Sequence, residues 1–219
     1  MSDVLDATVE SVLALGSPDP GQPIADMEAY ADDHDFPIVG ADVGRFFRTI
    51  ATMVDAERIF EFGSGFGYSA VWFAAALPAD GEIVLTDYDA TNRERARAFL
   101  DRADYGDRAR IEGGDALETV RETSGDFDVV LIDHEKHRYT EAFDAIADRL
   151  SRGGVVLADN VLAGPTDPAA VEAALEGESP RDEATAGVAA YLETVRDHPA
   201  FETAIVPLGE GVAVSVRRD

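Results

Sequence analysis

The stretch Arg58-Ile59-Phe60-Glu61-Phe62-Gly63-Ser64-Gly65-Phe66-Gly67 decides the fold class of this chain. Its first half, residues 58–62, carries the apolar residues Ile59, Phe60 and Phe62 and predicts a short buried strand. The glycines that follow predict a turn that opens a helix over residues 68–77. Glycines at such a turn let a ligand approach backbone N–H groups. The spacing is Gly-x-Gly-x-Gly and not the Gly-x-Gly-x-x-Gly of dinucleotide binding, so the turn alone does not identify a ligand.

Strands and helices alternate after this turn. Further strands are expected at 82–86, 109–112, 127–132 and 154–158, and helices at 93–103, 117–123, 140–150 and 187–196. This alternation indicates an α/β fold, with a mostly parallel sheet and helices on both faces. The last two strands, 201–206 and 212–217, flank Gly209-Glu210-Gly211 and predict an antiparallel hairpin at one edge, which makes seven strands in all.

Three helices are expected before the turn, at 3–15, 23–33 and 42–54. They would form a helical cap, residues 1–54, on a core of residues 55–219 within a single domain. Between strand 154–158 and helix 187–196 lies a long connection rich in Pro, Gly and acidic residues, with one short helix at 169–175. Long connections in compact domains tend to be functional.

The composition narrows the function classes. The chain has 219 residues, 44 acidic and 18 basic side chains, a formal net charge of −26 at pH 7 and no cysteine. Phosphate contact needs a basic face, so no nucleic-acid partner is expected, and disulfides and cysteine nucleophiles are excluded. The longest apolar run, Ala70–Leu77, is too short to cross a membrane, and residues 1–6 do not resemble a signal peptide. We therefore expect a cytoplasmic protein without a membrane partner.

The basic residues divide into 17 arginines and one lysine, Lys136. An acidic, lysine-poor surface resembles proteins of halophiles that keep molar salt in the cell, where a Debye length of about 3 Å at 1 M salt screens self-repulsion. In such a composition the one lysine is a candidate for chemistry, because a lysine can give up its proton and act as a base whereas an arginine effectively cannot. Chance survival on the surface is the alternative.

Asp87 follows the predicted strand 82–86, 24 residues after Gly63. A carboxylate at this position can accept hydrogen bonds from both ribose hydroxyls of a nucleoside. A helix cap for the next segment is the alternative. Together with the glycine turn, Asp87 indicates a nucleoside ligand without specifying which one.

Two further strand ends carry oxygen ligands. Strand 127–132 is followed by Asp133, and strand 154–158 by Asp159 and Asn160; parallel strands place these ends at one edge of the sheet. Two carboxylates and an amide oxygen suit Mg²⁺, or another divalent cation such as Mn²⁺ or Ca²⁺. A lone strand-end Asp usually caps a helix, but three oxygen ligands with Lys136 beside them favour a site.

These segments together resemble a known family. Residues 61–70, Asp87, 114–116, 127–139 and 153–161 look like the class I S-adenosylmethionine methyltransferases. More narrowly, Asp133-x-x-Lys136-x-x-Tyr139 followed by Asp159-Asn160 resembles the metal-dependent catechol and caffeoyl-CoA O-methyltransferases, over about residues 37–216. The resemblance implies a Rossmann-like class I methyltransferase fold. It also implies methyl transfer from S-adenosylmethionine to a hydroxyl of a small catechol-like acceptor chelated to a divalent metal.

The resemblance implies a role for each matching residue. Lys136 would be the catalytic base, and Asp133, Asp159 and Asn160 would hold the metal. Val39 would pack on the methionine end of the cofactor, Asp87 would hold its ribose, and Asp133 would also contact it. The residues around its amino-acid moiety would be Glu61, Gly63, Ser64, Gly65, Tyr68 and Ser69. Those framing its adenine would be Tyr88, Asp115, Ala116 and His134.

Two stretches depart from related plant enzymes. Residues 161–164 lack the aromatic residue that often follows the Asp-Asn pair, and Tyr191-Leu192 stands where a late helix often carries Phe-Asn. The acidic stretch 176–183 does not favour a coenzyme A thioester, so a free small aromatic diol is the expected substrate.

Two other functions and the oligomeric state stay open. One alternative is a nicotinamide-dependent oxidoreductase, but that function does not explain why Asp133, Asp159 and Asn160 occur together. The other is a non-catalytic methyltransferase-like binding protein, but that function does not explain why Lys136 is retained. The chain could be a monomer or a homodimer. The expected helix 3–15 would either form an interface or pack on the chain's own core.

Overall fold

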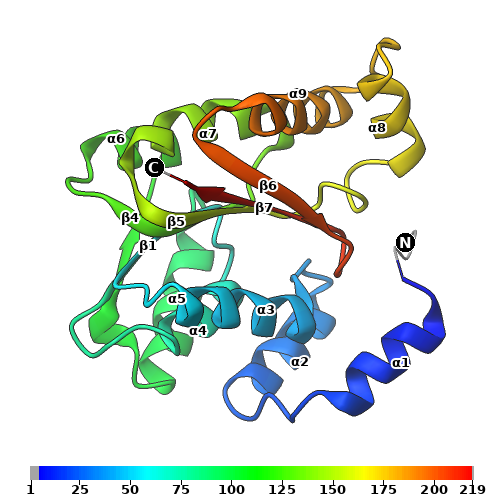
Figure 1. Cartoon of the computed structure of the whole chain (residues 1–219). Helices are drawn as coiled ribbons and strands as arrows, with labels where there is room; N and C mark the ends of the chain where they lie inside the picture. Colours follow the sequence, from blue (N-terminus) through cyan, green and yellow to red (C-terminus); the bar gives the residue numbers. More distant parts are fainter. Residues whose placement is uncertain (1–4, 219) are drawn as a thin grey trace.

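Short runs of buried apolar residues form the strands of the central sheet. The computed structural model describes residues 5–218, and Figure 1 shows the sheet between two layers of helices. The strands are β1 (Arg58–Phe62), β2 (Glu82–Thr86), β3 (Ala109–Glu112), β4 (Phe127–Ile132), β5 (Leu150–Ala158), β6 (Phe201–Val206) and β7 (Val212–Arg217). Their order is β3-β2-β1-β4-β5-β7-β6. The first five pair in parallel, and β7 is antiparallel to both β5 and β6, so the predicted fold class and hairpin are confirmed.

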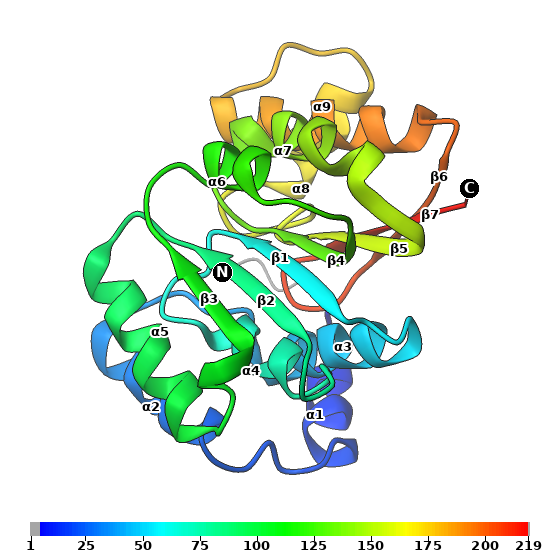
Figure 2. The same ribbon diagram turned by 90° about the vertical axis from the view of Figure 1, so that its left-hand side faces the viewer.

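Helices cover both faces of the sheet because its inner strands are apolar on both sides. In β1, Ile59 belongs to one hydrophobic cluster and Phe60 to the other, as expected when successive side chains alternate between faces. One layer holds α2 (Ile24–His34), α3 (Gly40–Met53), α4 (Tyr68–Ala74) and α5 (Ala90–Arg102). The other holds α6 (Ala116–Glu122), α7 (Tyr139–Ile146) and α9 (Glu183–Asp197), with α8 (Pro168–Leu175) against α9. Figure 2 shows the two layers on opposite sides of the strands.

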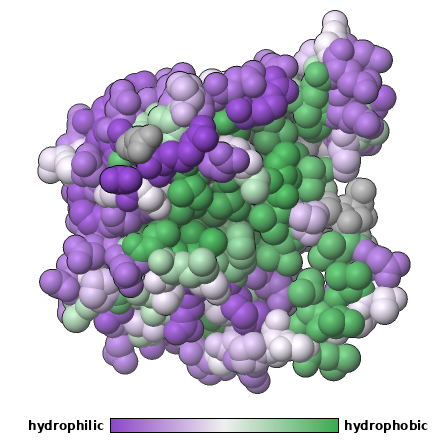
Figure 3. All heavy atoms as spheres, in the orientation of Figure 1, coloured by the Kyte–Doolittle hydropathy of each residue, from purple (hydrophilic) through white to green (hydrophobic). Residues whose placement is uncertain are grey.

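The first helix stands apart from the core. α1 (Ala7–Gly16) has no buried residue, and Val12 and Leu15 are 64% and 89% exposed. Figure 3 shows apolar residues gathered over this helix. The alternative in which helix 3–15 packs on the chain's own core is therefore wrong for the described part of this helix. Residues 1–4 lie outside the described residues.

Several predicted boundaries are wrong by a few residues. β5 begins at Leu150 and not at residue 154, because Leu150 already pairs with Phe127 and the strand continues through the register shift between Phe127 and Val129. α9 begins at Glu183 and not at residue 187, because the Asp182 side chain caps it by accepting a hydrogen bond from the Thr185 N–H (2.7 Å).

Short 3₁₀ turns connect some elements, namely η1 (Gly106–Arg108), η2 (Lys136–Arg138) and η3 (Ala147–Arg149). The helix expected over 140–150 is thus α7 followed by η3. None of the helices within residues 5–218 combines the length and apolar character that a membrane crossing requires.

Candidate functional site

The register of the sheet brings the predicted site residues to one edge. Phe62 in β1 pairs with Thr86 in β2 and with Ile132 in β4, and Ile132 pairs with Ala158 in β5. Each of these residues is the last of its strand. The chain therefore leaves the sheet side by side at Gly63, Asp87, Asp133 and Asp159, where open parallel sheets bind ligands.

The glycine turn lies directly against the end of β4. Gly63, Gly65 and Gly67 have φ values of 80°, 51° and 86°, a region that residues with a Cβ rarely adopt. Gly63 is required for a second reason besides its φ value, because a Cβ at this position would overlap the carbonyl oxygen of Asp133. The Ser64 N–H donates to the Thr86 carbonyl oxygen (2.9 Å), which ties the turn to β2 as well.

Glu61 is a buried acid without a cation. The residue is 0% exposed, and one carboxylate oxygen accepts a hydrogen bond from the Ser69 hydroxyl while the other, Oε2, has no partner. Burial raises the pKa of Glu61 to about 8, against the opposing effect of the Ser69 hydrogen bond. An ammonium group of a ligand would satisfy this carboxylate, because a buried charge needs a partner.

Asp87 lies beside the glycine turn. Its Oδ1 accepts hydrogen bonds from the Asp89 N–H (2.8 Å) and from Asn92 Nδ2 (3.3 Å). Burial raises its pKa, while hydrogen bonds from Asp89, Asn92 and the Gly65 backbone oppose the shift. The N-cap of α5 is Asp89 and not Asp87, so the helix-cap alternative for Asp87 is wrong.

The residues expected around adenine come together at the same edge. The exposed Tyr88 reaches across to Glu135, with its hydroxyl 2.9 Å from Oε1. Asp115 caps α6, whose first residue is Ala116, and also forms an ion pair with Arg138 (2.8 Å). Asp115 is thus engaged in structural contacts.

His134 packs between aromatic rings. Its ring stacks on Tyr139 at 5.7 Å and lies 5.3 Å from Phe62, and both ring nitrogens are buried without a partner. Burial lowers the pKa of His134 to about 4, so the ring is neutral near pH 7.

Two further cofactor candidates lie on the helical side of the turn. Tyr68, the first residue of α4, donates its hydroxyl to Glu28 of α2 (2.8 Å), and burial raises its pKa above the usual range. Val39 immediately precedes α3 and packs against the apolar cluster of that layer. Both side chains are held by the N-terminal helices.

Lys136 lies among three acceptors. The residue is 8% exposed, and its Nζ donates to Asp133 Oδ1 (3.0 Å), to the Tyr139 hydroxyl (2.5 Å) and to Asn160 Oδ1 (2.5 Å). The Tyr139 hydroxyl in turn donates to the Asp159 carbonyl oxygen (3.0 Å). The structure thus brings together Lys136 and the three predicted metal ligands, although these residues lie up to 27 positions apart in the sequence.

The oxygen-bearing side chains of this cluster could hold a divalent metal. Asp159 is 2% exposed, its Oδ1 has no partner, and burial together with the charge of Asp133 raises its pKa to about 8. Burial also raises the pKa of Asp133, against the effect of Lys136. Within residues 5–218 no group of three or more His, Asp or Glu side chains is placed to hold a metal. A three-ligand site at this position would therefore have to include the Asn160 amide oxygen. Two carboxylates and an amide oxygen fit Mg²⁺.

Two residues of the cluster had no predicted role. Tyr139 belongs to the motif Asp133-x-x-Lys136-x-x-Tyr139, but no role at the site is predicted for it from the sequence. Glu210 is expected there only as part of a hairpin turn. The Asn160 amide donates to the Glu210 carboxylate (2.5 Å). An acidic residue between two glycines, next to a strand that pairs with β5, is the signal that points to it.

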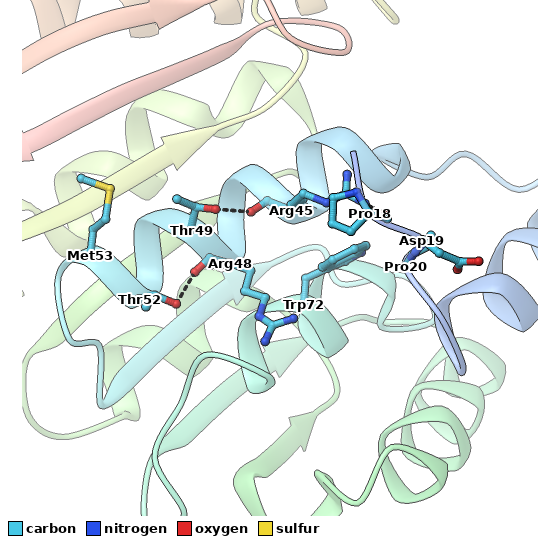
Figure 4. Close-up of a pocket in the computed structure, with 9 residues that line it drawn as sticks. All are labelled: Pro18, Asp19, Pro20, Arg45, Arg48, Thr49, Thr52, Met53 and Trp72. Atoms are coloured by element: carbon cyan, nitrogen blue, oxygen red, sulfur yellow. Dashed lines mark hydrogen bonds between the residues drawn. The ribbon is translucent and has the colours of Figure 1, made fainter. Parts of the chain in front are cut away.

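Two surface cavities lie outside this cluster. The one in Figure 4, of about 330 Å³, is lined by residues of α3, α4 and the segment after α1, among them Arg45, Arg48 and Trp72. The other, of about 400 Å³, lies between α9 and β6 near Leu192, Phe201 and Ile205. No predicted site residue lines either cavity, so neither changes the location of the candidate site.

Comparison with known proteins points to one family. The model of the O-methyltransferase family matches residues 27–218. The chain is 37% identical to a catechol O-methyltransferase of Niastella koreensis over 129 residues, which cover 57% of this chain and 58% of that protein. It is 34% identical to a catechol O-methyltransferase of Mycobacterium tuberculosis over 164 residues, 73% of this chain and 72% of the relative.

Solved structures share the fold. The O-methyltransferase TomG from Streptomyces achromogenes, in complex with SAM, superposes with a TM-score of 0.85 at 23% identity over 100% of both chains. The cofactor-bound protein Rv0187 from MTB has a TM-score of 0.81 at 26% identity, over 100% of this chain and 99% of that one.

Proposed function

Because the chain belongs to the O-methyltransferase family, we propose that it transfers the methyl group of S-adenosylmethionine to a hydroxyl of a small vicinal dihydroxy aromatic. The observation that carries the proposal is the cluster in which Lys136 Nζ lies within 3.0 Å of Asp133 and Asn160, beside the unpartnered oxygen of Asp159. The catechol O-methyltransferase relatives support this acceptor class.

The glycine turn and its neighbours would hold the cofactor. The buried carboxylate of Glu61 would pair with the cofactor's ammonium group, and Asp87 would accept hydrogen bonds from the ribose hydroxyls. The neutral ring of His134 would lie against the adenine. Together these contacts orient the sulfonium methyl and reduce the entropy lost on reaching the transition state.

Asp133, Asp159 and Asn160 would hold the divalent cation, with Mg²⁺ the expected ion. When bound, such a cation would supply a positive charge that lowers the pKa of the reacting phenol and favours a diol over a monohydroxy acceptor. Lys136, as a neutral amine, would accept the phenolic proton at its Nζ. The sulfonium C–S bond breaks as the O–CH₃ bond forms, so sulfonium and phenolate lose their charges together.

The direct test is a methyl-acceptor screen of the whole chain in high potassium chloride with added Mg²⁺. We expect turnover of catechol-type acceptors, measured as S-adenosylhomocysteine formation, and its loss in the presence of a chelator. Monohydroxy analogues serve as the matched control, because they cannot chelate a metal through two oxygens. Equal turnover of diol and monohydroxy acceptors would contradict the metal-chelation mechanism.

A variant separates the metal site from the cofactor site. Asp159→Ala removes one carboxylate ligand, so we expect it to abolish metal-dependent turnover while the affinity for S-adenosylmethionine, measured by calorimetry, stays within a few-fold. Full activity of this variant with a chelator present would overturn the assignment of Asp159.

A further inference from the structure

The turn between β6 and β7 lies against the metal-ligand cluster. Glu210, in Gly209-Glu210-Gly211, accepts a hydrogen bond from Asn160 Nδ2 at 2.5 Å. The other end of the same amide, Asn160 Oδ1, accepts from Lys136 Nζ. Glu210 and Asn160 are 50 residues apart in sequence, and the antiparallel pairing of β5 with β7 brings them together.

Backbone contacts hold Glu210 in place. Its carbonyl oxygen accepts hydrogen bonds from the N–H groups of Leu162 (3.0 Å) and Ala163 (2.9 Å). Gly164 lacks the Cβ that would overlap the Glu210 carboxylate, and Gly211 lacks one that would overlap Leu162. The segment after Asn160 and the turn before β7 therefore fit closely together, with the carboxylate directed at the amide.

The chemistry of the two groups makes the contact directional. An amide side chain has an acceptor at one end and a donor at the other, and its orientation is set by its partners. An ionised carboxylate only accepts hydrogen bonds, so Glu210 is compatible with the NH₂ end of Asn160 and not with its oxygen. The oxygen then faces Lys136, on the side of Asp133.

We propose that Glu210 is a positioning residue that holds Asn160 with its oxygen, and not its nitrogen, toward the metal. This inference rests on the proposed function, because it assigns Asn160 as a metal ligand. Outer-shell partners of metal ligands typically contribute about 10–100-fold to metal affinity, and we expect Glu210 to fall in that range.

A simple charge effect is the competing explanation. Glu210 is close enough to Asp133 and Asp159 for its negative charge to act on both, and that charge alone would attract a cation. The two explanations differ in one respect: positioning acts through Asn160, whereas a charge effect does not need the amide.

The experiment measures Mn²⁺ binding to the full chain by calorimetry, without acceptor, in a double-mutant cycle of Glu210→Ala and Asn160→Ala. We expect Glu210→Ala to raise the Kd for Mn²⁺ at least about 10-fold in the parent chain, and by less than about twofold when Asn160 is already alanine. Glu210→Gln should lose less than Glu210→Ala, because its amide oxygen still accepts from Asn160 Nδ2.

Glu202→Gln is the matched control. Glu202 lies on the same hairpin, is exposed and pairs with Arg218 (3.2 Å), so its loss should leave the Kd for Mn²⁺ unchanged. The affinity for S-adenosylmethionine checks that each variant is folded. If Glu210→Ala does not fold, Glu210→Gln still separates the explanations: positioning predicts a nearly unchanged Kd for Mn²⁺, whereas a charge effect predicts a higher Kd whether or not Asn160 is present.

The outcomes are distinct. An unchanged Kd for Glu210→Ala, with Mn²⁺ bound normally by the parent chain, overturns the role of Glu210 and leaves the proposed function intact. Equal losses for Glu210→Gln and Glu210→Ala that persist without Asn160 also overturn positioning, in favour of charge. A parent chain that does not bind Mn²⁺ overturns the metal site itself, and the role of Glu210 with it.

Discussion

At the scale of single residues, Lys136 combines an unusual composition with a specific environment. It is the one lysine of the chain, and its Nζ lies within hydrogen-bond distance of Asp133, Tyr139 and Asn160. An arginine there would keep the charge but could not act as a base near neutral pH. The residue therefore allows a test that separates charge from proton transfer.

Lys136→Arg should lower kcat by about 10²–10⁴, the usual contribution of general base catalysis. Activity should partly return at high pH, because the phenol then ionises without a base. The measurement is kcat against pH with a catechol acceptor, with calorimetry to check that cofactor and metal affinities are retained. A near-normal kcat at neutral pH would remove the catalytic role.

Glu61 gives a second prediction at this scale. Because burial raises its pKa to about 8, the ligand-free carboxyl is protonated at pH 7, and pairing with the cofactor's ammonium group requires it to ionise. Binding of S-adenosylmethionine at pH 7 should therefore release close to one proton. Calorimetry in two buffers of different ionisation enthalpy measures this release. Glu61→Gln should abolish it, whereas Asp87→Ala should weaken binding and keep it.

The same group affects stability without ligand. Its folded-state pKa of about 8 lies above the ordinary value of 4.5, so the folded protein binds more protons between these values. The contribution of Glu61 is full below pH 4.5 and is lost as pH rises through 8. The melting temperature of Glu61→Gln should accordingly fall less than that of the parent over this window; parallel curves would argue against a protonated Glu61.

At the scale of elements, α9 supports the turn that carries Lys136. Gly187 of α9 lies against η2 so closely that a Cβ would overlap the Lys136 carbonyl group. Tyr191, one turn further on, packs edge-on against Tyr139 at 5.7 Å. The position of the lysine thus depends on a helix about 50 residues away in sequence.

Gly187→Ala should displace η2 and reduce kcat by at least about 10-fold, with a loss of stability of about 1–3 kcal/mol from overpacking. Cofactor affinity, measured by calorimetry, should change little because the glycine turn is on β1. Gly44→Ala is the control: its Cβ would overlap the Trp72 indole, so it overpacks a region away from the cluster. If both variants lose the same stability and neither loses kcat, α9 does not position Lys136.

At the scale of the whole molecule, the excess of 26 negative charges dominates the surface. Several of the ion pairs within the described residues join two exposed side chains, and such pairs add little stability. Repulsion among the remaining carboxylates opposes the compact state until salt screens it. We propose on this basis that the protein is adapted to high salt.

The melting temperature should therefore rise as potassium chloride increases from dilute buffer into the molar range. Calorimetric scans at pH 7 measure this rise. Near pH 4.2, the isoelectric point of the sequence, the net charge is close to zero and the same salt series should have a smaller effect. A melting temperature that does not change with salt at pH 7 would contradict the adaptation.

The sequence by itself determined the helices and strands, and the edge of the sheet at which the strand-end carboxylates gather. Apolar residues clustered as in Arg58–Phe62, and helical periodicity, are properties of neighbouring residues, so they can be recognised without the fold. Asp87, Asp133 and Asp159 could be assigned to one edge because each follows a strand, and parallel strands end together. The rise in the pKa of Glu61 could not be predicted, because burial depends on what packs around the side chain.

Only the tertiary structure decided the contacts that complete the cluster. The side-chain bond of Asn160 with Glu210, the approach of Gly187 to η2 and the exposure of α1 each depend on elements distant in the sequence. The limits of β5 and α9 also differ from those predicted, through a register shift opposite Phe127 to Val129 and a cap at Asp182. The physical reason is the same in each case: periodicity and turn residues act locally, whereas pairing, close packing and burial arise only once the chain has folded.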